Sequence, residues 1–237
     1  RIEFVSETTP DRLQANRRFY FQRYVAGTPC SAVFVAARSR AVWLGATRQL
    51  IGTAWTGAKG FEYAGSIGPL DVTLNDQTQW QAIGNCLAGR FELSGLFGVD
   101  AVMTEDAIWV VEVNPRYTAS VEVLELAGDA NLMPLHVRAC QHGEVPAKWT
   151  VRPRRRVGKA IVFADKDGRV PADFGLFVRR VNSHQARPAV ADIPAVGREF
   201  HRGEPLVTVL AEGGSLADVE RSLRHQIGLV QASLGCV

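Results

Sequence analysis

Cysteine, histidine and methionine are scarce in this sequence. Its 237 residues include four cysteines, five histidines and two methionines. The cysteines are far apart, with no C-x-x-C pair and no neighbouring pair of histidines, which excludes the common zinc sites. We therefore expect reduced, mostly buried thiols at Cys30, Cys86, Cys140 and Cys236.

Long apolar runs and a strong charge imbalance are also missing. No stretch approaches the ~20 apolar residues needed to cross a bilayer, and no charged-then-apolar leader opens the chain. The 27 basic and 24 acidic residues give a net charge of only +3, which does not indicate a nucleic acid as the main partner. The densest basic run, 152–156, lacks the interleaved aromatic residues of a nucleic-acid-binding module. We expect a cytoplasmic protein that binds neither nucleic acid nor membrane.

A hydrophobic content of 46% is enough for one domain or two small ones. Runs of β-prone residues predict strands, and apolar residues spaced by three and four predict helices. The predicted strands are 19–25, 30–36, 41–51, 98–103, 108–113, 158–164 and 205–210, and the predicted helices are 75–93, 119–127, 132–141 and a closing helix that begins at Ser215. Five glycines between 52 and 68 predict a long loop there.

The composition changes at two places along the chain. Residues 1–18 are polar without a clear period, and the chain begins at Arg1 rather than at a methionine, so we expect the sequence to start inside a longer protein. Near residues 148–156, a proline and four arginines interrupt the apolar pattern, which is typical of a domain boundary. The predicted parts are an N-terminal remnant at 1–18, a main domain at 19–150 and a small β-rich extension at 151–237.

Three oxygen-bearing side chains are predicted to converge on the hairpin formed by residues 98–113. Glu112 and Asn114 are two residues apart on one strand, so their side chains leave the same face. Asp100 precedes Glu112 by twelve residues, and a hairpin loop with an odd number of residues would place it directly opposite. Hard oxygen ligands that leave room for phosphate and water are typical of Mg²⁺.

Arg116 follows this strand directly after Pro115, where a forked cation can hold a phosphate or a carboxylate beside the metal. A simpler interpretation gives these residues no ligand. In that interpretation Asn114 and Pro115 form an ordinary turn, and Glu112 faces solvent and pairs with Arg116. The short E-x-N-P-R motif alone does not decide between the two, since short motifs recur by chance.

The run G-V-D at 98–100 and the run V-E-V-N-P-R at 111–116, followed by Thr118 and Ser120, resemble the metal-binding end of the ATP-grasp carboxylate-amine ligases. The resemblance covers residues 19–140. It implies an α+β fold, with an antiparallel sheet that carries helices on one face and a small β-rich C-terminal domain after it. It also implies that ATP converts a carboxylic acid to an acyl phosphate, which an amine or a thiol then attacks, with release of ADP and phosphate.

The resemblance assigns roles to particular side chains. It implies that Asp100, Glu112 and Asn114 bind Mg²⁺, or Mn²⁺ in its place. It implies that Arg116 is the catalytic cation beside the transferred phosphate. The run Q-R-Y-V-A-G at 22–27 resembles the hinge strand whose backbone receives the adenine of ATP. The remaining candidates are Gln22, Arg23, Tyr24, Val25 and Lys59 for ATP, and Arg48 and Ser66 for the substrate.

Two features depart from the family pattern. Acidic residues usually contact the ribose near the hinge, whereas this sequence has Gln22, Arg23 and Pro29 at the corresponding places. The family's N-terminal domain, with its phosphate-binding lysines, has no counterpart before residue 19. Half of the nucleotide clamp is therefore expected outside this chain.

Three functions remain open from the sequence. The first is an ATP-grasp ligase that joins a small carboxylic acid to an amine, with a homodimer as the expected assembly. The second is a non-catalytic nucleotide-binding or assembly module that needs a partner chain. The third is a structural β-domain whose Glu112 and Asn114 bind nothing. Within the family, the runs 27–31, 63–69 and 119–124 are most similar to ligases linked to tetrahydromethanopterin and methanofuran one-carbon metabolism.

Overall fold

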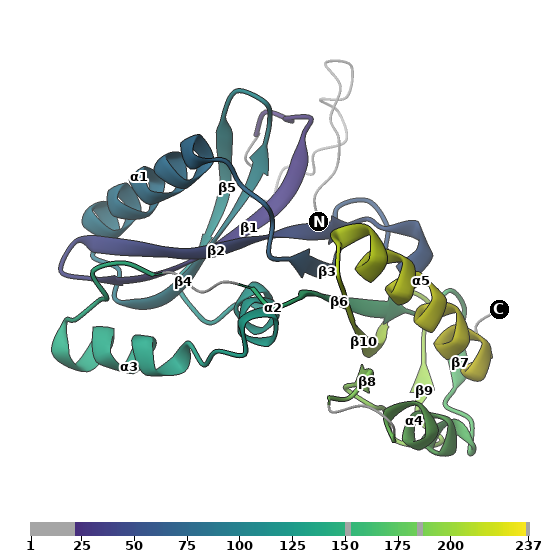
Figure 1. Cartoon of the computed structure of the whole chain (residues 1–237). Helices are drawn as coiled ribbons and strands as arrows, with labels where there is room; N and C mark the ends of the chain where they lie inside the picture. Colours follow the sequence, from purple (N-terminus) through teal and green to yellow (C-terminus); the bar gives the residue numbers. More distant parts are fainter. Residues whose placement is uncertain (1–21, 150–152, 184–186, 236–237) are drawn as a thin grey trace, which may run out of the picture.

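The computed structural model describes residues 22–149, 153–183 and 187–235. In this part of the chain, eight strands form one sheet in the order β5-β4-β1-β2-β3-β6-β10-β8, and all neighbours are antiparallel (Figure 1). Its strands are β1 (Thr28–Ala37), β2 (Arg40–Ile51), β3 (Tyr63–Gly68), β4 (Gly95–Met103), β5 (Ile108–Asn114), β6 (Arg156–Phe163), β8 (Val190–Ala191) and β10 (Pro205–Gly213). β7 (Gly168–Arg169) and β9 (Glu199–Phe200) form a second, two-stranded sheet.

Five α-helices and one short 3₁₀ helix accompany the strands in the described residues. They are α1 (Leu74–Phe91), α2 (Ala119–Gly128), α3 (Met133–His142), α4 (Phe174–Asn182), α5 (Leu216–Ser233) and the 3₁₀ helix η2 (Ala54–Thr56). The closing helix begins as predicted, because the Ser215 side chain accepts a hydrogen bond from the Asp218 backbone N–H. Within the described residues, none of the helices combines the length and the apolar character that crossing a bilayer requires.

Helices cover both faces of the sheet, so the side chains of β1 are buried on both sides. On one face, Phe34 stacks on Phe97 with ring centroids 5.0 Å apart, and Trp80 of α1 lies 6.3 Å from Phe34. On the other face, Val33 belongs to a cluster that includes Leu132 at the start of α3. Figure 1 shows α1 and α3 on opposite sides of the strands. The prediction of helices on one face was wrong, since a strand buried on both faces shows no alternation in sequence.

The chain after residue 153 extends the same sheet. β6 pairs with β3 on one side and with β10 on the other. α5 packs on this part of the sheet through an apolar stripe that includes Val219 and Leu223. A Cβ atom at Gly158 of β6 would lie 2.5 Å from Val219 Cγ1 and 2.7 Å from Leu223 Cδ1, so glycine permits the close approach of α5. The predicted C-terminal extension thus shares its sheet with the predicted main domain.

The predicted loop at 52–68 contains a strand, β3. Two glycines among its six residues make the segment look unfavourable for a strand. Gly65 has a φ of +142°, and a Cβ atom there would lie 2.0 Å from the carbonyl oxygen of Lys159 on β6. Glycine therefore lets the two backbones approach, and β3 joins β2 to β6. The strand predicted at 19–25 is wrong where the structure describes it, since residues 22–27 form no strand.

The cysteines are only partly as predicted. Cys30 is buried in β1, and burial raises the pKa of its thiol to about 12. Cys86 on α1 and Cys140 on α3 are exposed. All three are free thiols, and Cys236 lies outside the described residues. The expectation of mostly buried thiols was therefore wrong for two of the three.

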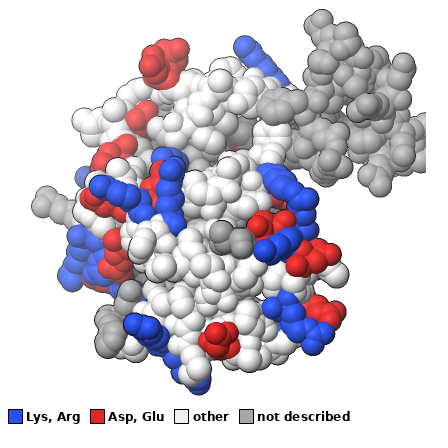
Figure 2. All heavy atoms as spheres, turned by 90° about the vertical axis from the view of Figure 1, so that its right-hand side faces the viewer, with Lys and Arg blue, Asp and Glu red and all other residues white. Residues whose placement is uncertain are grey.

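An ion-pair network connects the end of α2 to β10. Asp129 caps α2 in the left-handed region, at a φ of 49°. Its carboxylate accepts hydrogen bonds from Arg187 at 2.5 Å and from Arg155 at 2.8 Å. Both arginines also reach Glu212, each at 3.1 Å. On the face shown in Figure 2, basic and acidic side chains lie beside one another in the same way.

The substitution Asp129→Asn is expected to lower the melting temperature at neutral pH by a few degrees at most, because the pairs are partly exposed. Asparagine also suits the left-handed backbone. The hydrogen bond from Arg187 lowers the pKa of Asp129 in the folded state. The stabilisation is therefore present above the unfolded pKa of about 3.9 and is lost as the pH falls through the folded value.

Thermal melts of the native protein and the Asp129→Asn variant from about pH 7 to about pH 2.5 check this prediction. The difference in melting temperature should shrink below about pH 4. Asp106→Asn, in the exposed loop after β4, is the matched control and should change little at any pH. A difference for Asp129→Asn that stays constant down to the lowest pH contradicts the assignment.

Candidate functional site

Asp100 of β4 and Glu112 of β5 lie directly opposite each other in the sheet. The loop between the strands has four residues, 104–107, and Met103 therefore pairs with Ile108. A bulge at Val111 then adds one residue to β5, and this shift brings Glu112 opposite Asp100. The predicted pairing is confirmed. The predicted reason for it, an odd number of loop residues, was wrong.

Asn114, at the end of β5, forms hydrogen bonds with both Asp100 of β4 and Arg116. Its Nδ2 donates to Asp100 Oδ2 at 3.3 Å, and its Oδ1 accepts from Arg116 Nη2 at 3.2 Å. Asn114 is buried, whereas Arg116 and Glu112 are exposed. The structure thus brings Asp100, Glu112, Asn114 and Arg116 together. Among the described residues, Arg116 contacts Asn114 and the Tyr117 carbonyl and forms no ion pair with Glu112.

The donor set on this hairpin fits Mg²⁺ with a phosphate-bearing ligand. Two carboxylates directly opposite on an antiparallel pair repel each other, and in the described part of the chain neither Asp100 nor Glu112 forms an ion pair with a basic side chain. A divalent cation between them would offset that repulsion. No group of three or more His, Cys, Asp or Glu side chains is arranged for a metal in these residues. Mg²⁺ typically takes one or two carboxylates together with phosphates and water.

A band of buried polar side chains continues from this hairpin across the sheet, on the face that carries α2. Ser31 pairs in register with both Asp100 and Thr47. Thr47 Oγ1 lies 2.8 Å from Ser120 Oγ, at the start of α2. The Oγ1 atom of Thr118, the residue before α2, is buried without a hydrogen-bond partner among the described residues. The buried members of the band are Ser31, Thr47, Ser66, Asn114, Thr118 and Ser120.

The band ends at an ion pair on β6 and α2. Lys159 Nζ lies 2.5 Å from Glu122 Oε2. Next to this pair, Tyr63 Oη lies 2.9 Å from Ser66 Oγ. Burial raises the pKa of Tyr63 to about 12, and the negative charges of Asp100 and Glu122 add to that increase. The charges of a carboxylate from each place therefore act on the Tyr63 phenol.

Several of these residues are missing from the sequence-based candidates. Lys159 has a visible signal, because it is the single charged residue between Val157 and Phe163. Ser31 and Thr47 have none, since small hydroxyl residues are ordinary in strands. Only the register of β4, β1 and β2 brings these two side chains into line with Asp100.

Two candidates do not join the site. Arg48 points to the opposite face of β2 from Thr47 and is ion-paired with Glu220 of α5. Lys59 is exposed, and its backbone N–H donates to Glu62 Oε2 at 2.7 Å. Its loop is anchored through η2, which packs on α5 and β6. Ser66, the other substrate candidate, does lie on the face with Asp100.

The candidate adenine segment, residues 22–25, lies beside the tip of the β4–β5 hairpin. Thr28 pairs with Met103 at the start of β1. A Cβ atom at Gly27 would lie 2.5 Å from the Met103 carbonyl oxygen, so glycine allows the chain to pass close to β4. The Arg23 guanidinium lies 5.8 Å from the centre of the Trp109 ring. The segment is therefore next to the strands that carry Asp100 and Glu112.

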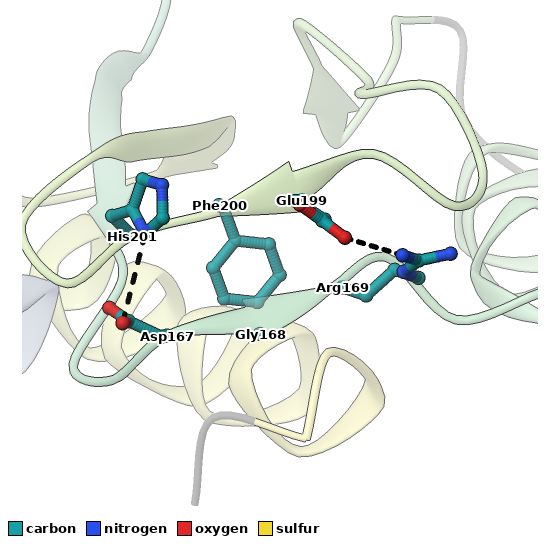
Figure 3. A pocket seen from close by; sticks show the side chains of 6 residues that line it. All are labelled: Asp167, Gly168, Arg169, Glu199, Phe200 and His201. Carbon is teal, nitrogen blue, oxygen red and sulfur yellow. Dashed lines mark hydrogen bonds and ion pairs between the residues drawn. The ribbon is translucent and has the colours of Figure 1, made fainter.

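A hollow of about 380 Å³ lies elsewhere, on the small sheet of β7 and β9. Figure 3 shows that two ion pairs cross it. Arg169 pairs with Glu199, and His201 Nδ1 lies 3.7 Å from Asp167 Oδ2. Phe200 is buried beneath them. The hollow belongs to this separate two-stranded sheet and not to the strands that carry Asp100 and Glu112, so we give it no part in the candidate site.

The sequence and the structure of this chain were each compared with those of known proteins. The model of a family described as the ATP-grasp domain matches residues 2–120. An uncharacterized protein of Methanocaldococcus jannaschii is 25% identical over 191 residues, which cover 81% of this chain and 42% of that protein. The L-amino acid ligase of Bacillus licheniformis has a similar structure, with a TM-score of 0.67 and 15% identity over 85% of this chain and 52% of the ligase.

A second similar structure contains a nucleotide and a metal. It is the biotin carboxylase domain dimer of the 2-oxoglutarate carboxylase of Hydrogenobacter thermophilus, in complex with MgADP, ADP and bicarbonate. Its TM-score is 0.57, with 11% identity over 83% of this chain and 44% of that one. At such identities the likeness concerns the fold alone. The chain spans about half the length of these matched proteins, between 42% and 52%.

Proposed function

This chain belongs to the ATP-grasp family, and from that premise we propose that it supplies the Mg²⁺-ATP site of a ligase that joins a carboxylic acid to an amine. The observation that carries the proposal is the register of β4 on β5, which places Asp100 opposite Glu112. Asn114 ties Arg116 to this pair. The bound MgADP of the carboxylase domain with the same fold supports the assignment.

The proposed reaction has two steps. A carboxylate oxygen of the acid attacks the γ-phosphorus of ATP, the bond to the β-phosphate oxygen breaks, and ADP leaves. The amine then attacks the carbonyl carbon of the acyl phosphate, phosphate leaves and a proton is released. A metal held by Asp100 and Glu112 would offset negative charge on the phosphate oxygens. Arg116 would donate hydrogen bonds to the transferred phosphoryl group, and Asn114 would hold Arg116 in that position.

Of the remaining candidate residues, the proposal keeps some and leaves out others. We place the adenine along 22–25, because that segment borders the hairpin tip. Ser66 remains a substrate-side candidate because it lies on the same face as Asp100. Arg48 and Lys59 are left out, because Arg48 is paired with Glu220 on the opposite face and Lys59 is held on the α5 side. The link to one-carbon metabolism, a homodimer and a cytoplasmic location stay predictions.

An assay of the whole protein that contains this chain tests the proposal. The protein is incubated with Mg²⁺-ATP, a panel of small carboxylic acids and hydroxylamine, which traps acyl phosphates as hydroxamates. We expect acid-dependent release of ADP and phosphate in equal amounts, together with a hydroxamate. Formation of AMP and pyrophosphate would overturn the acyl phosphate step. Nucleotide binding without acid-dependent turnover over the whole panel would instead favour the non-catalytic nucleotide-binding module.

A further inference from the structure

The ion pair between Lys159 and Glu122 occupies an unusual place for two charges. Lys159 is on β6, between β3 and β10 in the middle of the sheet. Its register partner on β3 is Ser66, whose hydroxyl contacts Tyr63. The Lys159 side chain is 22% exposed and that of Glu122 is 38% exposed. Both charges are therefore held at the sheet surface, where a bound molecule can still reach them.

A purely structural role explains this pair poorly. A partly exposed ion pair contributes little to stability. α2 is already held on the sheet by Val121, Val123 and Ala127, all fully buried, and by the hydrogen-bonded Thr47 and Ser120. Glu122 does lie in the first turn of α2, where the helix dipole favours an acidic side chain. That preference accounts for the acid but not for a lysine in an interior strand.

The pair also shares its face with the proposed metal site. The buried polar band connects the two, and the phenol of Tyr63 is influenced by both Asp100 and Glu122. One positive and one negative group side by side match the ammonium and the carboxylate of an amino acid. Charge-assisted hydrogen bonds of this kind are the strong ones in recognition.

We propose that Lys159 and Glu122 bind the amine substrate, and that this substrate is an amino acid whose carboxylate contacts Lys159 and whose ammonium group contacts Glu122. The proposal rests on the proposed ligase function and names the class of its amine substrate. The Tyr63 hydroxyl, which contacts the buried Ser66 hydroxyl, would lie beside the bound carboxylate. The amino acid would thereby be held on the same face of the sheet as Asp100, at the other end of the buried polar band.

Isothermal titration of the whole protein in the presence of Mg²⁺ and ADP tests the proposal without depending on turnover. The probes are L-alanine, ethylamine, which lacks the carboxylate, and propionate, which lacks the ammonium group. L-Alanine should bind at least about tenfold more tightly than either of the other two, and Lys159→Met and Glu122→Gln should each remove about that tenfold. Equal binding of the three probes, or unchanged L-alanine affinity in Lys159→Met, would overturn the proposal.

Two comparisons separate recognition from structure. Arg169→Met, which breaks the exposed pair with Glu199, is the matched control and should leave the affinity for L-alanine unchanged. The double swap of Lys159→Glu with Glu122→Lys keeps an ion pair and should restore the melting temperature, but not the order of the three affinities. If the swap restored both the melting temperature and the order of the three affinities, the ion pair would have a structural role only, and the proposal would be overturned. Absence of acid-dependent ADP release in the native protein would count against the ligase function and leave this binding result standing.

Discussion

The substitution Glu112→Gln in the whole protein is expected to lower ATP turnover on the order of a thousandfold. The side-chain volume is kept and only the charge is lost, so one of the two carboxylates that face each other on β4 and β5 can no longer hold a metal. Glu112 is exposed, and removing its repulsion with Asp100 should leave the melting temperature equal or slightly higher. Steady-state ADP release and a thermal melt check both parts.

Glu105→Gln is the matched control for this substitution. Glu105 is exposed in the loop that joins the same two strands, and it lies on neither face of the ladder. The control should keep nearly full ATP turnover. A Glu112→Gln protein that is folded and retains more than about a tenth of native turnover would contradict the metal assignment.

The substitution Arg116→Met is expected to lower kcat by about a hundredfold and to change the KM for ATP much less. Arg116 spends two of its five N–H groups on Asn114 and on the Tyr117 carbonyl, within the described residues. The remaining donors can stabilise charge that develops on the transferred phosphoryl group. A loss that is concentrated in kcat is the signature of an interaction made mainly in the transition state.

Arg116→Lys and Arg90→Met complete this comparison. Lysine keeps the charge but not the planar fork, so it should recover only part of the lost rate. Arg90 is exposed on α1, on the other side of the sheet, and its loss should have little effect. If Arg116→Met matched the native kcat, or raised only the KM for ATP, Arg116 would have no role in phosphoryl transfer.

The hairpin at the centre of the site was readable from the sequence because its signals are local. Glu112 and Asn114 share a face by the period of a strand, and Arg116 follows within the same motif. The pairing with Asp100 was predicted through an incorrect loop count. The bulge at Val111 supplies the missing residue, and no composition signal marks it.

The rest of the site depends on contacts between distant segments. β3 was hidden because its glycines resemble those of a loop, although Gly65 is needed for the close approach of β6. The role of Lys159 becomes visible only once β6 is placed beside β3, which brings it next to Ser66 and under α2. Register and helix placement, not residue type, make these polar groups into one band.

The assignment of helices to one face failed for a related reason. β1 is apolar on both sides, so its sequence cannot tell how many layers cover it. Arg48 shows the same limit for a single residue. Arg48 directly follows Thr47 on β2, so its side chain lies on the opposite face of the sheet, where it pairs with Glu220.

The most direct test of the central claim is a titration of the whole protein with Mn²⁺ in the presence of ADP, followed by electron paramagnetic resonance. The native protein should bind Mn²⁺ with ADP at this hairpin, and Asp100→Asn and Glu112→Gln should each weaken that binding by at least about tenfold, whereas Glu105→Gln should not. Equal Mn²⁺ affinity in all four proteins would contradict the claim that Asp100 and Glu112 form the metal site.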